Sequence, residues 1–327
     1  MHNKLTPELM AGIAMVREAS LLSRRIQQEL TSVAMIKEDR SPVTVADFSV
    51  QALIARRLEE CFPKDALVGE EDGGFLQGQD EALQAVVAAF VKPCIPVADQ
   101  HSVAAWINRG NGEPCERFWV LDPIDGTKGF LRGGQFAVAL SLLVDYEVAV
   151  GLLGCPNLHL SCFEKPGVVV YASAGNGTWA IPLDGYREAA ALHVSATANG
   201  TEARMLFSFE SSHTNEATIS AFMQEMGIVT EPVRIDSQAK QGLLAAGDGE
   251  FLLRVPPADG LDYKEKIWDQ AAGMIVIEEA GGRVTDLDGK PLDFSAGRKL
   301  ENNRGVLCSN GVLHERALGV LNARPSL

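Results

Sequence analysis

The segment from residue 119 to residue 130 constrains the fold of this chain more than any other. It reads Trp-Val-Leu-Asp-Pro-Ile-Asp-Gly-Thr-Lys-Gly-Phe, so an apolar run ends in a polar corner that carries Asp122 and Asp125. Pro123 fixes the backbone φ angle between the two acids, and Gly126 permits a sharp turn after them. The segment therefore predicts a buried strand with two carboxylates at its end.

Two carboxylates at the end of a buried strand repel each other and lose hydration, and a cation placed between them relieves both costs. Hard divalent cations such as Mg²⁺ prefer oxygen ligands and usually keep positions open for water and a substrate phosphate. Thr127 adds a hydroxyl group beside such a site. The same letters are also typical of a surface turn, because Asp-Pro and Asp-Gly pairs are common in turns. Taken alone, this segment supports a turn and a metal site about equally.

The charge of the chain narrows the class of ligand. It has 43 acidic and 29 basic residues, a net charge of −14, which argues against the nucleic-acid backbone as the main ligand. A bound metal could still supply a local positive field for a small phosphorylated ligand. The 327 residues suffice for one large or two modest domains, and no run approaches the roughly 20 apolar residues of a membrane span. We therefore expect neither a nucleic-acid partner nor a membrane segment.

The six cysteines are scattered through apolar segments and form no Cys-x-x-Cys pair. This pattern predicts reduced, mostly buried thiols and gives no support to a zinc site. The first seven residues resemble neither a secretory signal nor an arginine-rich presequence. The expected location is the cytoplasm.

Acidic residues also stand at the ends of two early elements. Asp47 stands where a helix is expected to begin, and the local sequence favours a helix-capping role for it. A short apolar strand over residues 67–69 leads into Glu70, Glu71 and Asp72. Such an acidic run usually lies in a solvated loop, but here it ends a strand, as Asp122 and Asp125 do. Convergence of these acids on one metal site is therefore plausible.

Asp269 also stands at the end of an element, because it begins an apolar helix that runs to about residue 280. Its carboxylate could cap that helix or point into a metal site. The chain contains no Walker loop, no Gly-x-Ser-x-Gly elbow and no early dinucleotide fingerprint, and it has only six histidines. The residues alone therefore lead as far as an enzyme with a carboxylate-bound divalent metal that acts on a phosphate.

The first half of the chain is predicted to begin with helices and to continue as strands. A helix starts at Thr6-Pro7, another spans residues 80–92, and residues 93–116 form an irregular surface excursion. Apolar runs at 136–144 and 147–153 are joined by two residues, which indicates a hairpin. Further strands are expected at 158–163, 168–172 and 177–181.

The second half alternates between strands and helices. Strands are expected at 205–209, 233–235 and 250–255, with polar loops and helices between them, which is the βαβ pattern. Loops at the carboxyl ends of such strands are where α/β proteins place their sites. A soft boundary at residues 155–157 divides the chain into parts 1–156 and 157–327, with the site expected between them.

Three segments, 69–72, 119–127 and 268–273, resemble the three metal-site motifs of the lithium-sensitive inositol monophosphatase superfamily. They occur in the right order across nearly the whole chain, and the three motifs together are highly specific. The resemblance implies an α/β fold: a layered αβαβα sandwich of the type shared with fructose bisphosphatase. Its first part (1–156) would be an α+β metal-binding part, and its second (157–327) an α/β nucleotide-binding part.

Within the superfamily the chain is most similar to the 3′(2′),5′-bisphosphate nucleotidases. The segments that carry this similarity are 41–47, 128–135, 211–214, 236–240, 253–256 and 264–269. No shared motif is recognised over 91–116 or 186–201.

The resemblance also implies roles for individual residues. Glu70, Asp122 and the Ile124 carbonyl would hold one Mg²⁺, and Asp122, Asp125 and Asp269 would hold another. Thr127 and Asp47 would orient and deprotonate the attacking water, and the backbone N–H groups of Gly126 and Thr127 would bind phosphate. The residues that would bind the nucleotide are His213, Ser237, Lys240 and Arg254.

Local sequence offers simpler roles for some of these residues. Ser237 could be a helix cap, and Lys240 and Arg254 could be solvated charges. Arg132 and Lys264 are weaker candidates, because each could be only a surface charge, and Glu71 is a weaker candidate for a direct metal ligand.

The implied activity is a phosphatase with two or three Mg²⁺ ions that is inhibited by Li⁺. It would convert 3′-phosphoadenosine 5′-phosphate (PAP) to AMP and phosphate. A second conversion to test is that of 3′-phosphoadenosine 5′-phosphosulfate (PAPS) to adenosine 5′-phosphosulfate (APS). One alternative is a phosphatase of the same superfamily that acts on inositol phosphates or a sugar bisphosphate. Another is an inactive scaffold that senses a metal or a nucleotide. The expected state is a monomer.

Overall fold

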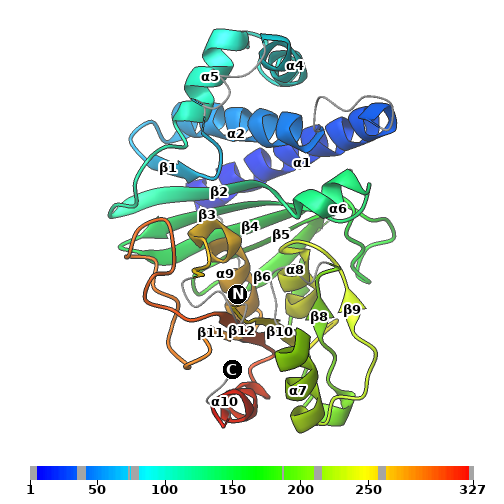
Figure 1. Ribbon diagram of the computed structural model, residues 1–327. Helices are drawn as coiled ribbons and strands as arrows, with labels where there is room; N and C mark the ends of the chain where they lie inside the picture. The colour runs from blue at the N-terminus through cyan, green and yellow to red at the C-terminus, as the bar shows by residue number, and fades with distance from the viewer. Residues whose placement is uncertain are drawn as a thin grey trace.

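The computed structural model describes residues 6–34, 42–72, 74, 81–185, 188–209, 216–256 and 263–323. Helices and sheets alternate in five layers (Figure 1). The first layer contains α1 (Pro7–Ala34) and α2 (Pro42–Cys61). The third contains α8 (Ala239–Ala245) and α9 (Ala271–Glu279), and the fifth contains α7 (Glu216–Met226) and α10 (His314–Asn322). The second and fourth layers are β-sheets. This arrangement confirms the predicted αβαβα sandwich.

The first sheet has seven strands that follow one another in chain order. Its strands are β1 (Ala66–Gly69), β2 (Arg117–Asp125), β3 (Ala137–Val144), β4 (Glu147–Cys155), β5 (Val168–Ser173), β6 (Thr178–Pro182) and β7 (Ala190–Leu192). β1 pairs with β2 in parallel, and every later pair is antiparallel. The predicted boundary after residue 156 falls between β4 and β5, which are hydrogen-bonded neighbours in this sheet.

β2 is apolar along its whole length because both of its faces are covered. Trp119 and Leu121 belong to the core beneath α1 and α2, whereas Phe118 and Val120 belong to the core on the side of α8 and α9. A strand buried on both faces reads as a continuous apolar run. The pairing of β2 with β3 shifts register between Asp122 and Asp125, around a proline that has no N–H to donate.

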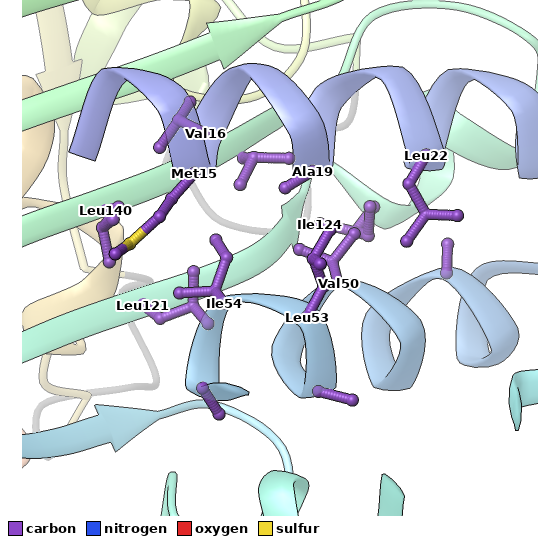
Figure 2. Packing of buried hydrophobic residues seen from close by; sticks show 14 of the residues in the cluster. Met15, Val16, Ala19, Leu22, Val50, Leu53, Ile54, Leu121, Ile124 and Leu140 are labelled. Carbon is purple, nitrogen blue, oxygen red and sulfur yellow. The ribbon is translucent and has the colours of Figure 1, made fainter. Parts of the chain in front are cut away.

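The first core joins the two long helices to the sheet. Figure 2 shows Met15, Val16, Ala19 and Leu22 of α1 and Val50, Leu53 and Ile54 of α2 near Leu121 and Ile124 of β2 and Leu140 of β3. All of these side chains are almost completely buried. This core fixes the end of β2 relative to α2, which carries Asp47.

α2 begins at Pro42, five residues before Asp47. The prediction that the helix starts at Asp47, with its carboxylate as a cap, was therefore wrong. Proline is favoured in the first turn of a helix, where its missing N–H has no partner to lose, so the helix extends to Pro42. Asp47 lies in the second turn and is buried, with an exposed fraction of 9%.

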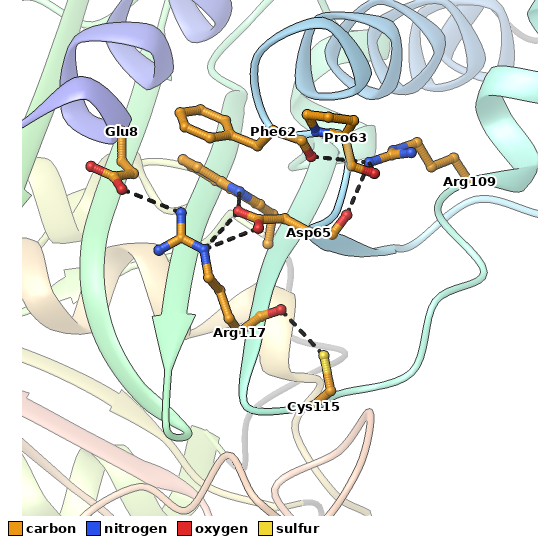
Figure 3. Close-up of polar contacts among 8 residues, drawn as sticks. Glu8, Phe62, Pro63, Asp65, Arg109, Cys115 and Arg117 are labelled. Carbon is orange, nitrogen blue, oxygen red and sulfur yellow. Dashed lines mark hydrogen bonds and ion pairs between the residues drawn. The ribbon is translucent and has the colours of Figure 1, made fainter.

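The start of β2 is held by a network of charged side chains (Figure 3). Arg117 Nε donates to both carboxylate oxygens of Asp65, at 3.0 and 2.9 Å, and the guanidinium also pairs with Glu8. Trp119 Nε1 donates to Asp65 Oδ2 at 3.0 Å. Arg109 donates to the carbonyl of Asp65 at 2.9 Å. The network fastens the turn before β1 to the neighbouring strand.

The fourth layer is built from two ladders. β8 (Leu206–Phe207) and β9 (Val233–Arg234) pair in parallel across α7, which confirms the predicted βαβ unit. β12 (Val306–Ser309) lies between β10 (Phe251–Arg254) and β11 (Arg283–Thr285), antiparallel to both. A parallel bridge between Met205 and Phe251 connects the ladders. β9 and β10 therefore end near α8, on the side of the first sheet.

The remaining helices are short or peripheral. They are α4 (Glu81–Val91), α5 (Gln100–Asn108), α6 (Thr127–Leu131), η1 (Gly200–Glu202) and η2 (Ile267–Asp269). α5 corrects the prediction of an irregular excursion over 93–116: Asp99 accepts from Ser102 N, and Ser102 Oγ accepts from Asp99 N, which is a complete capping box.

Two further predictions were wrong. Residues 158–163 form turns, with Leu158 N bonded to the Cys155 carbonyl, because Pro156 and Asn157 reverse the chain at the end of β4. The cysteines are not mostly buried: Cys61, Cys115 and Cys162 are exposed, and only Cys155 and Cys308 are buried. No helix within the described ranges is long and apolar enough to cross a lipid bilayer.

Candidate active site

A cleft of about 410 Å³ opens where β1 and β2 end, opposite α8, β10 and η2. Ten of the residues predicted for the site line it: Glu70, Asp122, Ile124, Asp125, Gly126, Thr127, Ser237, Lys240, Arg254 and Asp269. Asp47 is not among the lining residues, and His213 lies outside the described residues. The cleft therefore collects side chains from segments that are up to about 200 residues apart. We call Glu70, Asp122, Asp125 and Asp269 the acidic wall, and Lys240 and Arg254 the cationic wall.

The turn after β2 places the acids and Thr127. Gly126 has a φ angle of +89°, in the left-handed region that glycine adopts without strain. A Cβ at this position would lie 2.8 Å from the Cβ of Ser237, so the turn also approaches the opposite wall closely. Thr127 follows as the first residue of α6 and is exposed to the cleft. The glycine is thus required both by its backbone angle and by the space available.

Asp122 is the most buried of the acids. Its exposed fraction is 2%, and its Oδ1 atom has no hydrogen-bond partner within the part of the chain that the structure describes. Burial, followed by the negative charge of Glu70, raises its pKa well above the usual range. The fold thus buries this carboxyl group beside a second acid, with one oxygen that accepts no hydrogen bond from the described residues.

Asp125 and Asp269 extend the acidic wall. Burial raises the pKa of Asp125, although Lys240 and a hydrogen bond from Gln238 N act in the opposite direction. Loss of solvent around Asp269 raises the pKa of its carboxyl group to about 8, and the positive charge of Arg254 offsets only part of that effect. Both groups would be stabilised as anions by an added cation.

The acidic loop after β1 is hydrogen-bonded to the helix that carries Asp47. Gln51 lies one helical turn after Asp47 and is completely buried. Its side chain donates to the Glu71 carbonyl at 2.5 Å and accepts from Glu71 N at 3.1 Å. Burial, followed by the charges of Glu71 and Glu70, raises the pKa of Asp47, and burial raises that of Glu71 to about 7. Asp47 and the acidic loop are therefore electrostatically coupled.

The donors of the acidic wall fit a hard divalent cation such as Mg²⁺. Carboxylate oxygens are the ligands such an ion prefers, and the unpartnered Asp122 Oδ1 is a buried acceptor of this type. As the side chains stand, no three Asp, Glu, His or Cys residues of the described ranges are arranged so that they could hold a metal ion. The fit therefore concerns the chemistry of the donors, and the ligand set stays a prediction.

The cationic wall consists of Lys240 and Arg254, and neither is a solvated surface charge. Lys240 is buried, and its Nζ donates to Ser237 O at 2.8 Å, Ser208 Oγ at 3.0 Å and Ile235 O at 3.3 Å. Burial lowers its pKa to about 8. The alternative that Lys240 is a solvated charge was therefore wrong.

Arg254 pairs with an acid behind the cleft wall. Its Nε lies 2.9 Å from Glu265 Oε2, which also accepts from Gln270 Nε2 at 2.9 Å. Burial opposes the charge of Arg254, but Glu265 and Asp269 outweigh burial and raise its pKa. The guanidinium is thus held charged at the cleft by a buried carboxylate.

Ser237 does not begin its helix in the way expected of a cap. Its φ angle is +70°, and its Oγ accepts from Ala239 N at 3.2 Å, while Gln238 occupies the cap position of α8. A positive φ angle is uncommon in a residue other than glycine and often marks a functional site.

Sequence reasoning missed Gln238, which connects the two walls. Its backbone N–H donates to Asp125 Oδ2, its side-chain amide donates to Trp268 O at 3.0 Å, and its Oε1 accepts from Gly273 N at 3.2 Å. Gln238 lies inside the segment 236–240 that carries part of the family resemblance. That segment was the available signal, but the contacts of Gln238 depend on the fold.

The weaker candidates lie at the edge of the site or outside it. Arg132 pairs with the buried Asp236, and its guanidinium lies 5.7 Å from the ring centre of Phe209. Lys264 donates to the carbonyls of Glu301 and Asn303, at 2.6 and 3.0 Å, and does not line the cleft.

Comparison with known proteins adds a family to this geometry. The model of the inositol monophosphatase family matches residues 7–325. A 3′(2′),5′-bisphosphate nucleotidase from Schizosaccharomyces pombe is 36% identical, with 95% of this chain and 94% of the relative covered. A 3′(2′),5′-bisphosphate nucleotidase from Dictyostelium discoideum is 38% identical, with 93% of each chain covered.

Solved structures agree at the level of the fold. An IMPase from Thermotoga maritima superposes with a TM-score of 0.64 at 20% identity, covering 97% of this chain and 98% of that one. SuhB from Mycobacterium tuberculosis gives a TM-score of 0.62 at 20% identity, covering 97% of both chains. The match to the family model over nearly the whole length, together with these relatives, shows that the chain belongs to the inositol monophosphatase family.

Proposed function

We propose that this chain is a Mg²⁺-dependent 3′(2′),5′-bisphosphate nucleotidase that hydrolyses the 3′-phosphate of PAP to give AMP and phosphate, and that converts PAPS to APS. Relatives with that name align over almost the full length of both chains. The observation that carries the proposal is the cleft itself, which brings Asp122, Asp125 and Asp269 together with Lys240 and Arg254. A substrate with two phosphates needs both walls: one for the phosphate that leaves and one for the phosphate that stays.

The acidic wall would hold the metal ions. Glu70, Asp122 and the Ile124 carbonyl would bind one Mg²⁺, and Asp122, Asp125 and Asp269 would bind a second. When bound, the ions supply charge stabilisation for the phosphoryl group and the leaving oxygen. The raised pKa values of Asp122 and Asp125 support this assignment, because a carboxyl group that is costly to ionise alone is stabilised by a neighbouring cation. Inhibition by Li⁺ and the possibility of a third Mg²⁺ belong to the same proposal.

The chain's own groups would then orient water and substrate. Thr127 is exposed to the cleft, and its hydroxyl would orient the attacking water. Asp47, whose pKa is raised by burial, would accept the proton from that water. The backbone N–H groups of Gly126 and Thr127 would donate to the phosphate.

The cationic wall would hold the rest of the nucleotide. Lys240 and Arg254 would bind the 5′-phosphate, and Ser237 and His213 would contact the nucleoside. With a pKa of about 8, Lys240 is mostly charged at pH 7, and a bound phosphate would favour its charged form further. Arg254 stays charged because Glu265 lies behind it.

The test is phosphate release from PAP, inositol 1-phosphate and fructose 1,6-bisphosphate with Mg²⁺ and then with added Li⁺. We expect PAP to be preferred, Li⁺ to inhibit and Asp122→Ala to remove turnover. Preference for inositol 1-phosphate or the sugar bisphosphate would retain the metal chemistry and refute the nucleotide assignment. No turnover on any substrate would refute the enzyme and favour a metal- or nucleotide-sensing scaffold.

The surroundings in which the protein works are also proposals. We propose that it acts in the cytoplasm as a monomer. All six cysteines are free thiols, which fits a reducing compartment. Light scattering after size-exclusion chromatography would test the monomer, and a dimer peak at micromolar concentration would refute it.

A further inference from the structure

The acids of the cleft belong to segments whose relative positions are fixed in different ways. Glu70 directly follows β1, and β1 pairs with β2, so Glu70 N donates to Leu121 O at 3.2 Å. The sheet therefore fixes Glu70 relative to Asp122. Asp269 ends η2, which belongs to no sheet. Contacts between side chains and the backbone must set the distance from Asp269 to Glu70.

Arg298 touches the residue that precedes each of these two acids. Its Nη2 donates to the carbonyl of Gly69, and its Nη1 donates to the carbonyl of Gly112 at 3.1 Å. The centre of its guanidinium lies 5.1 Å from the ring centre of Trp268. Gly69 precedes Glu70, and Trp268 precedes Asp269, so one side chain spans both segments.

The backbone of Arg298 also contacts η2, the short helix that ends at Asp269. Its carbonyl accepts from Ile267 N at 3.2 Å, at the first residue of η2. Next to it, Lys266 and Lys299 form an isolated antiparallel bridge, and Leu300 N donates to Glu265 O at 2.9 Å. Residues 298–300 therefore pair with residues 265–267, which directly precede Trp268 and Asp269.

An arginine is suited to these contacts in a way that a lysine is not. The guanidinium is planar and carries several N–H donors, so it can donate to two carbonyls while its face lies against an indole ring. A lysine ammonium keeps the charge but offers neither the planar face nor the two-pronged geometry. The contacts of Arg298 use both the planar face and the two-pronged geometry of the side chain.

We propose that Arg298 is a positioning residue that sets the spacing between Glu70 and Asp269, and so tunes the affinity of the acidic wall for divalent metal. The inference deepens the proposed function, because it rests on the assignment of these acids to the metal ions. Arg298 does not line the cleft, so it acts through Gly69 and Trp268 and makes no contact with substrate.

The chain offers a matched control in Arg109. Its Nη2 also donates to backbone carbonyls, those of Phe62, Pro63 and Asp65, at 3.3, 3.4 and 2.9 Å (Figure 3). These carbonyls precede β1, at the opposite end of the strand from Glu70. Arg109→Lys therefore loses comparable contacts with backbone carbonyls, at the end of β1 that lies away from both acids.

The experiment compares Arg298→Lys, Arg298→Met and Arg109→Lys with the unmodified protein. The Mg²⁺ concentration that raises the thermal unfolding midpoint measures metal affinity without turnover. We expect both Arg298 variants to require about tenfold more Mg²⁺ or higher, the effect reported for losing residues that orient metal ligands. At saturating Mg²⁺ the KM for PAP should be unchanged. Arg109→Lys should keep the normal Mg²⁺ dependence.

Amide hydrogen exchange without Mg²⁺ tests the geometry separately. Arg298→Lys should speed exchange at residues 67–70 and at residues 267–270 together, whereas Arg109→Lys should leave 267–270 unchanged. Normal Mg²⁺ dependence in Arg298→Lys would overturn the inference, as would equal changes in both lysine variants. If the unmodified protein neither responds to Mg²⁺ nor hydrolyses PAP, the proposed function fails, and the exchange data still decide whether Arg298 joins the two segments.

Discussion

The carboxyl group of Asp122 raises the free energy of the folded chain in the absence of a cation. It is almost fully buried, lies close to Glu70 and has one oxygen without a partner. Its pKa is higher in the folded state than in the unfolded chain, so ionisation of this group at neutral pH opposes folding. A group retained at that cost is typical of a functional site, where stability is given up for activity.

Asp122→Asn should therefore separate stability from activity. We expect the variant without Mg²⁺ to unfold with a free energy about 1 kcal/mol higher than the unmodified protein, because the buried negative charge is removed. Turnover should be lost, and added Mg²⁺ should no longer raise the unfolding midpoint. Urea unfolding with and without Mg²⁺ measures both effects. A variant that is less stable without Mg²⁺ would contradict this explanation of the raised pKa.

His314 provides a second prediction, on pH. It is completely buried, with Nε2 3.0 Å from Thr285 Oγ1 and Nδ1 2.8 Å from Ser309 Oγ. Thr285 donates its own proton to Asp286 O, so the ring is assigned as neutral, with its proton on Nε2. Burial lowers the pKa of His314 to about 4, below the 6.5 of the unfolded chain.

Because the unfolded chain binds this proton more readily, stability should fall as the pH drops from about 6.5 toward 4. Between pH 7.5 and pH 5, His314 should contribute a loss of about 2 kcal/mol. His314→Gln removes the titrating group and should reduce the pH dependence of unfolding by that amount. Urea unfolding at the two pH values would show it, and an identical pH dependence in both proteins would refute the assignment.

Single residues also show where sequence reasoning reached its limit. The acids at 70, 122, 125 and 269 could be predicted because each lies in a contiguous motif. Gln51, Gln238 and Arg298 could not, because each acts on a segment distant in sequence. The wrong role for Asp47 had the opposite cause: a local capping rule was applied without knowing where α2 begins.

At the scale of elements, the turn between β2 and α6 combines a left-handed backbone with a close approach to the opposite side of the cleft. Gly126 has a positive φ angle, and a Cβ there would lie 2.8 Å from Ser237. Gly133, just beyond the other end of α6, has a φ angle of +69° but no atom within 4 Å of a built Cβ. The two glycines share a left-handed backbone conformation and differ in the space around them.

Gly126→Ala and Gly133→Ala should therefore differ in both stability and activity. We expect Gly133→Ala to cost about 1 kcal/mol of unfolding free energy, from the left-handed backbone alone. Gly126→Ala should cost about 2 kcal/mol or more and should also lower turnover, because the contact with Ser237 moves the two walls apart. Chemical unfolding and PAP hydrolysis test the pair. Equal effects of the two substitutions would exclude a role for the close approach of Gly126 to Ser237.

Elements with a regular pattern were predictable, and those defined by tertiary contacts were not. The hairpin of β3 and β4 follows from two apolar runs and a two-residue link. The helix α5 was missed because Pro and Gly flank it, although its capping box at Asp99 and Ser102 was present in the sequence. The strand predicted at 158–163 is apolar because Leu158, Leu160 and Phe163 are buried while the chain turns.

At the scale of the whole molecule, the five layers bring acids and cations from both halves of the chain into one cleft. Glu70, Asp122 and Asp125 come from the first sheet, and Lys240 and Arg254 come from the second half of the chain. We therefore keep the parts 1–156 and 157–327 as a proposal about function. Two independently folding units would have to separate β4 from β5, which are paired.

The assignment of Lys240 and Arg254 to the phosphate that is not hydrolysed predicts that this second phosphate contributes to substrate binding. PAP and 3′-AMP carry the same 3′-phosphate and differ by the 5′-phosphate alone. If Lys240 and Arg254 bind that group, its loss removes charge-assisted hydrogen bonds worth about 1.5–3 kcal/mol. Arg254→Met should remove the same contribution for PAP while leaving 3′-AMP almost unaffected.

The most direct measurement is the ratio of kcat/KM for PAP to kcat/KM for 3′-AMP at saturating Mg²⁺. We expect a ratio of about 10 or more in the unmodified protein, and a ratio that falls toward 1 in Arg254→Met. A ratio near 1 in the unmodified protein, or one that Arg254→Met leaves unchanged, would contradict the assignment of the cationic wall to the 5′-phosphate and with it the bisphosphate nucleotidase.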